Sequence, residues 1–274
     1  MNTNQKISIS IFLIIFFLIL SINNIFSSRV FSQENDSPKI IPRTVLVELF
    51  VQEGCLTCPT AEFCLEDLAW EYGTSKFILV QEHLWGDGYD TPETNARYNW
   101  YIGDGKKGTP DLFIDGLTKR LQGLSCDCVE GNYECYKDAI DEELARSSLL
   151  EISAVKTPHP NPIPQGEGEE EKVANIIIEG TVKNISDTLL TDLAICGMVG
   201  NEGNESGLYN YIQDIFPFQN MPPLLPGAVF SFKFIPEIPF TPESEIDGEE
   251  EILHLVIFVQ NLETKEVLQA LYVE

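Results

Sequence analysis

The sequence predicts an α/β domain, with a mixed sheet and flanking helices, followed by an all-β antiparallel sandwich-like domain. Between residues 44 and 148, segments with strand-like and helix-like hydrophobic spacing alternate along the chain. Over residues 149–274, short strand-like segments follow one another, with turn residues between them and no long helix. A chain of 274 residues, of which 43% are hydrophobic, is long enough for two ordinary domains.

The first 32 residues are predicted to be a secretory signal peptide. Lys6 precedes an uncharged apolar run, and Val30 and Ser32 fit the small-residue pattern before a cleavage point at Gln33. The alternative is an uncleaved membrane anchor, because residues 7–28 carry no charge and could just span a bilayer. We therefore expect an exported protein of the periplasm or extracellular envelope, attached to a membrane only if this segment is uncleaved. Residues 33–43 would be a polar lead-in.

The exported part is strongly acidic. Without Lys6 and Arg29 it keeps 15 basic against 43 acidic residues. Such a surface repels phosphate backbones, so we expect no nucleic-acid partner. The acidic residues do not have the spacing of a calcium loop, and solubility outside the cell explains the charge. We expect no cofactor.

The elements of the predicted α/β domain follow from local patterns. Two segments rich in β-branched and apolar residues predict strands, and apolar residues at helical spacing predict helices. Asp90 or Thr91 with Pro92 gives a helix-entry signal, and Asp115-Gly116 favours a tight hairpin turn. In chain order we predict a strand over 44–51, a helix over 59–72, a strand over 76–85, a helix over 90–103, a hairpin over 108–123 and a helix over 132–147.

The second half is predicted to consist of strands only. Its apolar segments are short and are separated by loops rich in proline, glycine and acidic residues. The strand-like segments cover 149–155, 173–185, 189–199, 228–235, 251–261 and 265–273. Strands at this spacing are typical of an antiparallel sandwich.

Two cysteines stand between the first predicted strand and the first predicted helix. Cys55 and Cys58 are separated by two residues, and Pro59 follows. At a helix start this spacing lets both sulfurs come within disulfide distance without strain. The first sulfur would lie near free N–H groups and the positive end of the helix dipole, which favours its thiolate. We therefore predict Cys55 as the attacking nucleophile and Cys58 as the resolving thiol.

Together with the later segment Gly108-Thr109-Pro110, this motif resembles the active site of the thioredoxin superfamily. The segments "VELFVQEGCLTCP", "GTPDLFIDG" and "ETKEVLQA", with Trp85 at a strand end, are similar to exported bacterial thioredoxin-like proteins. Those proteins carry a β-rich C-terminal extension and are mostly of unassigned function. The resemblance implies a thioredoxin-like fold over residues 44–147. It also implies a cis-proline at Pro110 beside the cysteine pair and substrate backbone contacts from Thr109.

The sequence departs from thioredoxin around the motif. Leu56-Thr57 replaces Gly-Pro, and the nearby charges of Glu48, Glu53 and Glu62 are negative. These charges would oppose ionisation of Cys55, so we expect a modest lowering of its pKa and a reducing or neutral poise. Glu48 is a possible proton acceptor for Cys58, although it stands one position away from the acid of thioredoxins.

The other five cysteines have separate interpretations. Cys126, Cys128 and Cys135 form a possible second thiol centre, or a local staple that closes a loop onto the last predicted helix. Three free thiols there would instead favour a thiolate metal site. Cys64 and Cys196 lie in apolar patterns and are predicted to be buried thiols.

The function predicted from these features is that of an extracytoplasmic thiol-disulfide oxidoreductase. It would act on disulfides of envelope or secreted proteins, with protein thiols and an unknown redox partner as reactants. One alternative is a copper metallochaperone that uses the CxxC and CxC thiolates, since soft thiolates suit Cu(I). Another is a non-catalytic envelope binding module with a structural CxxC disulfide. A zinc site would need four ligands, and His83, His159 and His254 are scattered.

Overall fold

The computed structural model describes residues 41–123, 129–158, 172–174, 176–201, 210–236, 238–240 and 253–273. The chain from Ile40 to Glu274 forms one compact unit. The predicted signal segment, Cys126, Cys128 and His159 lie outside the described residues. Within the described ranges, no helix is both long enough and apolar enough to cross a membrane.

The helices and strands predicted before residue 148 are present, with ends that differ by a few residues. α2 begins after Thr57, with Pro59 in its first turn, and ends at Gly73, whose φ of 71° suits glycine. The elements are β1 (Val45–Val51), α2 (Cys58–Tyr72), β2 (Phe77–His83), α3 (Pro92–Ile102), β3 (Asp111–Ile114), β4 (Lys119–Gln122) and α4 (Val129–Leu144).

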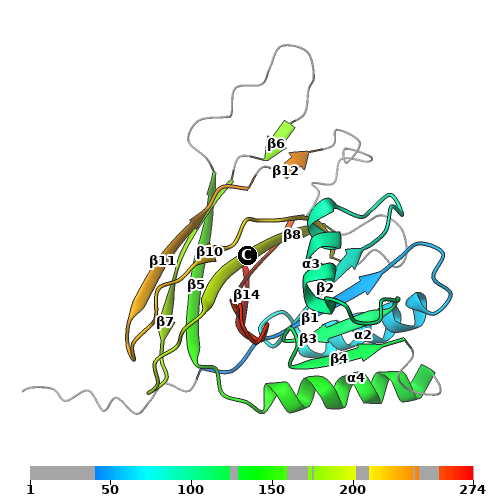
Figure 1. Cartoon of the computed structure of the whole chain (residues 1–274), viewed down its shortest axis with the longest axis horizontal. Coiled ribbons are helices and arrows are strands. Elements are labelled where there is room, and N and C mark those ends of the chain that lie inside the picture. The colour runs from blue at the N-terminus through cyan, green and yellow to red at the C-terminus, as the bar shows by residue number, and fades with distance from the viewer. Residues whose placement is uncertain are drawn as a thin grey trace, which may run out of the picture. The chain divides into compact units, whose positions relative to one another are not determined.

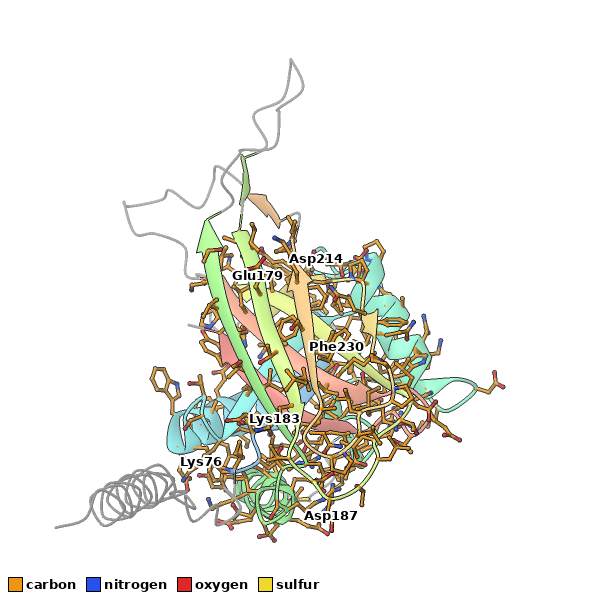
Figure 2. The ribbon with its side chains drawn as sticks, turned by 90° about the vertical axis from the view of Figure 1, so that its left-hand side faces the viewer. Lys76, Glu179, Lys183, Asp187, Asp214 and Phe230 are labelled. Carbon is orange, nitrogen blue, oxygen red and sulfur yellow. A yellow bond between two sulfur atoms is a disulfide. The ribbon has the colours of Figure 1, made fainter. Side chains whose placement is uncertain are left out.

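The second half of the chain contributes strands, as its turn-separated apolar segments indicated. They are β5 (Leu150–Pro158), β6 (Lys172–Ala174), β7 (Ile176–Asn184), β8 (Leu193–Asn201), β9 (Tyr211–Ile215), β10 (Gln219–Asn220), β11 (Val229–Phe234), β12 (Ile238–Phe240), β13 (Leu253–Asn261) and β14 (Val267–Val273). β5, β7 and β11 form a separate antiparallel sheet in the order β11-β7-β5, and β12 pairs with β6. Figure 2 shows Glu179 and Lys183 on β7 of the three-stranded sheet.

The prediction of a thioredoxin-like α/β fold followed by a separate all-β sandwich is wrong. Strands make up 46% of the structure and helices 21%. Strands from both halves of the sequence join one mixed sheet of nine strands, in the order β14-β13-β8-β9-β2-β1-β3-β4, with β10 paired to β8 (Figure 1). β2 and β9 pair at Gln81 and Tyr211, which links the two halves. The fold is therefore mostly β.

Side-chain packing explains why the two halves share a sheet. On one face of β1 and β2, Leu46, Ile78 and Val80 are buried against strands from the second half rather than against a helix. Their partners are Ala194, Cys196, Met198, Ile212, Val256, Phe258, Val267 and Ala270. Removing this apolar surface from water favours the joined sheet over two separate folds.

A buried ion pair strengthens the link between the halves. The Arg43 side chain donates from Nε to Asp115 Oδ2 over 2.7 Å and from Nη2 to the carbonyl of Val267 over 2.7 Å. The hairpin turn after Asp115 also meets the start of β14, where Gly116 forms a bridge with Glu266. A Cβ on Gly116 would lie 2.0 Å from the carbonyl oxygen of Lys265, so this contact requires glycine.

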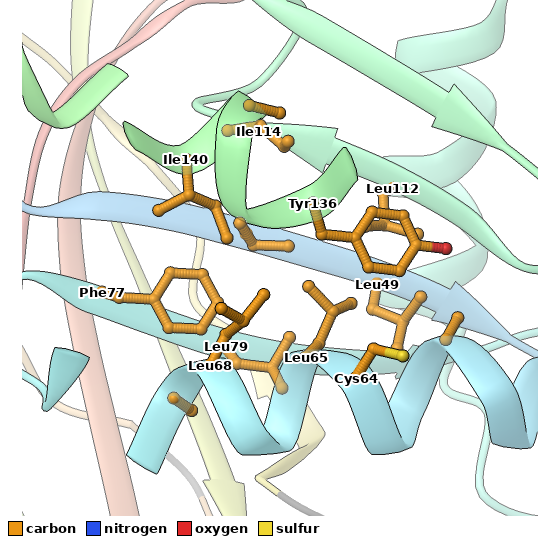
Figure 3. Close-up of a cluster of buried hydrophobic side chains, with 14 of the residues drawn as sticks. Leu49, Cys64, Leu65, Leu68, Phe77, Leu79, Leu112, Ile114, Tyr136 and Ile140 are labelled. Atoms are coloured by element: carbon orange, nitrogen blue, oxygen red, sulfur yellow. The ribbon is translucent and has the colours of Figure 1, made fainter. Parts of the chain in front are cut away.

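The other face of β1 and β2 packs against helices. Val45, Val47 and Leu49 join side chains of α2 and α4 in one core, part of which is drawn in Figure 3. A second core lies between β8, β13 and β14 and the three-stranded sheet. A small aromatic cluster around Phe50, Tyr98 and Phe113 anchors α3. The loops that follow β1 and β2 are thus carried on strands that are buried on both faces.

Candidate redox site at the start of α2

The two predicted reactive cysteines are joined in a disulfide at the start of α2. Cys55 and Cys58 have Cα atoms 5.5 Å apart, within the range usual for disulfides. Cys58 is 2% exposed, whereas Cys55 is half-buried and the neighbouring Leu56 is 97% exposed. An incoming thiol or disulfide therefore has easier access to the Cys55 sulfur.

A backbone N–H and a hydroxyl lie at the more accessible sulfur. The N–H of Cys58 donates to Cys55 Sγ over 3.1 Å, and the Thr57 hydroxyl lies 3.7 Å from the same sulfur. Because this N–H begins a helix of 15 residues, it offers partial positive charge to a thiolate at Cys55. The arrangement can stabilise the thiolate that leaves when the disulfide opens.

A buried aspartate holds the loop that carries Cys55. The Glu53 N–H donates to Asp87 Oδ2 over 3.0 Å, and His83 Nδ1 lies 2.7 Å from the same oxygen. The other oxygen, Oδ1, accepts from the backbone N–H groups of Tyr89 and Asp90. Asp87 thus ties the loop after β1 to the loop after β2. Sequence reasoning missed Asp87. An aspartate between two glycines is a signal for the local bonds to Tyr89 and Asp90, but not for the bond to Glu53.

Thr109 and Pro110 lie at the same end of the sheet as the cysteine pair. β3 runs antiparallel to β1 with Asp111 opposite Phe50, so the residues just before β3 lie near the end of β1 that leads into the cysteine loop. The Thr109–Pro110 peptide bond is cis, and Pro110 is buried. Tyr98 fixes this loop, because its hydroxyl accepts the N–H of Gly108 and donates to Asp111 Oδ2.

Glu48 lies on the face of β1 opposite to the one that packs with Cys58, and this position does not suit the predicted role of proton acceptor. Alternate residues of β1 point to opposite faces. Val47 and Leu49 share a core with Cys58, whereas the Glu48 carboxylate faces α3 and is bound by Arg97 and Tyr101. The Arg97 Nη2 to Glu48 Oε2 distance is 2.9 Å and the Tyr101 hydroxyl to Glu48 Oε2 distance is 2.6 Å. The carboxylate thus belongs to a buried network on the far face.

That network contains a second buried acid. Glu82 on β2 is fully buried, and its Oε1 lies 3.9 Å from Arg97 Nε. Burial, together with the neighbouring charge of Glu48, raises the pKa of Glu82 well above its usual value. Gln260 on β13 completes the group, since its Nε2 donates to the Tyr101 hydroxyl over 2.8 Å. One guanidinium therefore serves two buried carboxyl groups at the junction of α3 and β13.

The negative charge expected near the cysteines is smaller than the sequence suggested. Burial, with a further contribution from the Glu66 charge, raises the pKa of Glu62 to about 7. Glu62 is half-buried and lies one helical turn after Cys58. At neutral pH much of this side chain is protonated, so it opposes a nearby thiolate less than a fully ionised glutamate would.

The remaining cysteines do not join this site through any disulfide among the described residues. Cys64 is 3% exposed and Cys196 5% exposed, which confirms that both are core residues. Burial raises the pKa of Cys196 to about 12. Cys135 is half-buried and has a free thiol. Its expected partners, Cys126 and Cys128, lie outside the described residues, so the second thiol centre stays a prediction.

The described part of the chain holds no group of three or more His, Cys, Asp or Glu side chains placed to bind a metal ion. His83 is engaged with Asp87 and packs near Tyr89 and Tyr211. His254 lies on β13 and contacts Tyr272. Neither histidine is combined with the cysteine pair into a metal-binding set.

Comparisons with known proteins include a solved structure of similar fold. No protein-family model matches the sequence, and no curated protein matches it. HBP35 of Porphyromonas gingivalis has a TM-score of 0.58 and 17% identity, over 84% of this chain and 74% of that chain. At this identity the likeness concerns the fold alone.

Two glycosidases give weaker matches. Bacteroides uniformis β-glucuronidase has a TM-score of 0.29 and 19% identity, over 45% of this chain and 12% of that chain. Listeria innocua β-glucosidase has a TM-score of 0.22 and 18% identity, over 47% of this chain and 16% of that chain. At such TM-scores these matches carry no argument about fold or function. The chain is thus similar in fold to HBP35.

Proposed function

We propose that the protein is an extracytoplasmic thiol-disulfide oxidoreductase that acts on disulfides of envelope or secreted proteins through Cys55 and Cys58. The observation that carries this proposal is the asymmetry of the pair. Cys55 is the more accessible sulfur and accepts the helix N–H of Cys58, whereas Cys58 is buried beneath it. A disulfide is suited to exchange when one of its sulfurs is accessible and the thiolate of that sulfur is stabilised by a nearby N–H group.

The bonds and electrons of the exchange balance between the cysteine pair and the substrate disulfide. In the reducing direction the Cys55 thiolate attacks a substrate disulfide, which forms a Cys55–substrate bond and releases one substrate thiolate. The Cys58 thiolate then attacks Cys55 Sγ, which releases the second substrate thiolate and restores the Cys55–Cys58 disulfide. Two electrons pass from the pair to the substrate. In the oxidising direction the same steps run in reverse, and a redox partner restores the starting state of the pair.

The experiment that tests the proposal is peptide-resolved thiol labelling of the exported chain. The protein is equilibrated in a series of metal-free glutathione buffers of graded redox potential, quenched and mapped. Joint titration of Cys55 and Cys58 at an accessible potential would support a redox centre, and the midpoint would give its direction. A pair that stays oxidised throughout would contradict the proposal and leave a structural disulfide in a binding module.

A trapping variant separates the roles of the two sulfurs. Cys58→Ser keeps the accessible thiol and removes the resolving one, so we expect it to accumulate a mixed disulfide at Cys55 with a disulfide-bearing peptide. Cys55→Ser should accumulate far less, because the remaining sulfur is buried. Cys196→Ala is the matched control, since it removes a buried free thiol outside the pair and outside the predicted second thiol centre. Equal trapping in all three variants would contradict the assigned roles.

A further inference from the structure

A groove lies next to the loop that follows β2 and contains Asp87. It has a volume of about 890 Å³ and is lined by the start of α3, by β9 with the residues that follow it, and by the end of β11. The lining segments are residues 90–93, 213–217 with Gln219, and 233–236. The three segments come from distant parts of the sequence, and β11 belongs to the separate three-stranded sheet, so the groove forms where the two halves of the chain and the two sheets meet. Its size is within the range of ligand-binding clefts.

One wall of the groove offers a strand edge. β9 pairs with β8 from Tyr211 to Ile215. On its other side, pairing with β2 is confined to Tyr211 within the described ranges. Beyond Tyr211, no other strand among the described residues pairs with this side of β9. Such an edge can pair with an added extended chain.

Apolar side chains form the floor and the rim of the groove. Phe216 and Phe234 are each 4% exposed, with ring centroids 5.5 Å apart, and belong to the core beneath. Ile235 lines the groove and is 47% exposed, and the nearby Phe218 is 54% exposed. Large apolar residues exposed beside a recess are typical of surfaces that bind other molecules.

The charges of the groove favour a cationic ligand. Asp90 and Glu93 contribute carboxylates at the start of α3, and Asp214, which is labelled in Figure 2, lines the groove from β9. The lining lysine, Lys233, already pairs with Glu179 over 2.7 Å. Hydrogen bonds from the Gly86 N–H and the Asn95 amide lower the pKa of Asp90 and keep it ionised. The groove therefore has a surplus of negative charge beside its apolar floor.

The groove is connected to the cysteine loop through one side chain. Asp87 accepts the Glu53 N–H on one oxygen and the Asp90 N–H, over 3.1 Å, on the other. Glu53 precedes the cysteine loop, and Asp90 begins the groove wall. A chain that lay in the groove would thus reach the same end of the sheet as Cys55.

We propose that this groove binds an extended segment of the substrate protein, one that carries apolar side chains and lysine or arginine residues. The inference rests on the proposed function, because it identifies the groove's ligand as the polypeptide whose disulfide Cys55 attacks. The substrate backbone would pair with the edge of β9, its apolar side chains would cover the exposed Ile235, and its cations would lie near Asp90 and Glu93.

The test uses two fluorescent twelve-residue peptides that share an alternating valine and phenylalanine pattern. One has lysines at the remaining positions and the other has glutamates. Each is made with a central serine, to measure binding alone, and with a central cysteine in a mixed disulfide with a small thiol, to measure exchange. Fluorescence anisotropy with the exported chain gives the dissociation constant, and release of the small thiol gives the exchange rate.

We expect the lysine peptide with serine to bind at least about tenfold more tightly than the glutamate peptide, and salt to reduce the difference. Glu93→Lys should weaken binding of the lysine peptide about fivefold. Ile235→Ser should weaken it about threefold. The matched controls are Glu134→Lys on α4 and Leu225→Ser, because both residues are exposed and neither lines the groove.

The outcomes separate this inference from the proposed function. Selective binding of the serine peptide without any exchange would support the groove and overturn the redox proposal. Equal exchange rates for lysine and glutamate peptides would leave the redox proposal standing and overturn the groove as a substrate site. A peptide that copies residues 241–252 of this chain should bind much more weakly than the lysine peptide. If it bound as tightly, or if the chain formed dimers that Ile235→Ser disrupts, the groove would bind this chain itself and its role as a substrate site would be overturned.

Discussion

The two faces of β1 show how one strand serves two different purposes. On one face, Val47 and Leu49 pack with α2 and support the helix that begins at the cysteine pair. On the other, Leu46 packs against strands from the second half, and Glu48 binds Arg97 within a buried network. The cysteine pair therefore lies at the accessible end of a largely apolar layer, while the buried charges join the two halves of the chain. Acidic residues near a reactive motif in sequence need not share its face.

The largest expected effect comes from breaking the buried network. Arg97→Met should cost about 3–5 kcal/mol in free energy of unfolding, because it leaves the Glu48 and Glu82 carboxyl groups buried without their guanidinium partner. Urea denaturation measures the change. Lys137→Met is the control, since its ion pair with Glu71 lies at the surface and should matter much less. Equal losses in the two variants would mean that the buried network contributes little.

A pair of core substitutions compares the two faces directly. Leu46→Ala and Leu49→Ala remove side chains that are each 0% exposed, so each should destabilise the fold by about 2–5 kcal/mol. Both variants should unfold in one transition, because both faces belong to one compact unit. The measurement is urea unfolding followed by tryptophan fluorescence and by circular dichroism. Two separate transitions for Leu46→Ala would show that the halves unfold independently.

A smaller effect depends on pH and concerns the helix face. The pKa of Glu62 rises from an ordinary 4.5 to about 7 in the folded chain. The folded state therefore holds this proton more tightly than the unfolded state does. The resulting stabilisation is complete below the unfolded pKa and disappears as the pH rises through the folded one. We expect a contribution of about 1 kcal/mol after allowing for solvent screening.

Substitution isolates this contribution. Glu62→Gln should flatten the fall in stability between pH 4.5 and about 7, relative to the unsubstituted chain. Urea midpoints across that pH range provide the measurement. Glu134→Gln on α4 is the control, because its side chain is exposed. An unchanged slope in Glu62→Gln would show that the proton is bound elsewhere.

The smallest expected effect is at the tip of the cysteine loop. Leu56 is 97% exposed, so Leu56→Ser should change the free energy of unfolding by less than about 0.5 kcal/mol. Thermal unfolding with the disulfide intact tests this. A loss comparable to that of Leu49→Ala would mean that the loop is packed against the fold rather than presented to solvent.

Local elements could be predicted because their signals are local. Helical spacing over 59–72, the helix-entry residues at Thr91 and Pro92 and the Asp115-Gly116 turn each act within a few residues. The sheet order could not be predicted in this way, because it depends on pairing between residues as distant as Gln81 and Tyr211. Nothing in either short segment specifies the other.

One signal for the shared sheet was present in the sequence but was misinterpreted. β8 is buried at all nine positions and β13 at seven of its nine. Strands of a two-layer sandwich alternate between core and solvent, whereas a strand covered on both faces has an unbroken apolar run. The runs over 193–199 and 255–259 therefore indicated additional layers on both sides. Correctly interpreted, they would have argued against a separate sandwich.

The candidate site was predicted only in part, because some of its contacts are local in the sequence and others are not. Cys55 and Cys58 are specified by their own spacing at a helix start, and the structure brings them together. Glu48 was predicted as a proton acceptor by analogy with the acid of thioredoxins, which stands one position away, and the two-residue period of a strand puts it on the other face. Asp87 acts through a hydrogen bond to a backbone group more than thirty residues away, which the sequence pattern did not indicate.

The link between Arg43 and β14 has a consequence for the order of folding. β1 and β2 lie close in the sequence, but their apolar face is completed by strands that begin only at residue 193, and Arg43 bonds to Val267. Leu46, Ile78 and Val80 therefore stay exposed to water or to a chaperone until nearly the whole chain is available for folding. Closing so long a loop slows folding, and until it closes the apolar face of β1 and β2 is exposed and prone to aggregation. A chain that ends before β13 would keep that face uncovered.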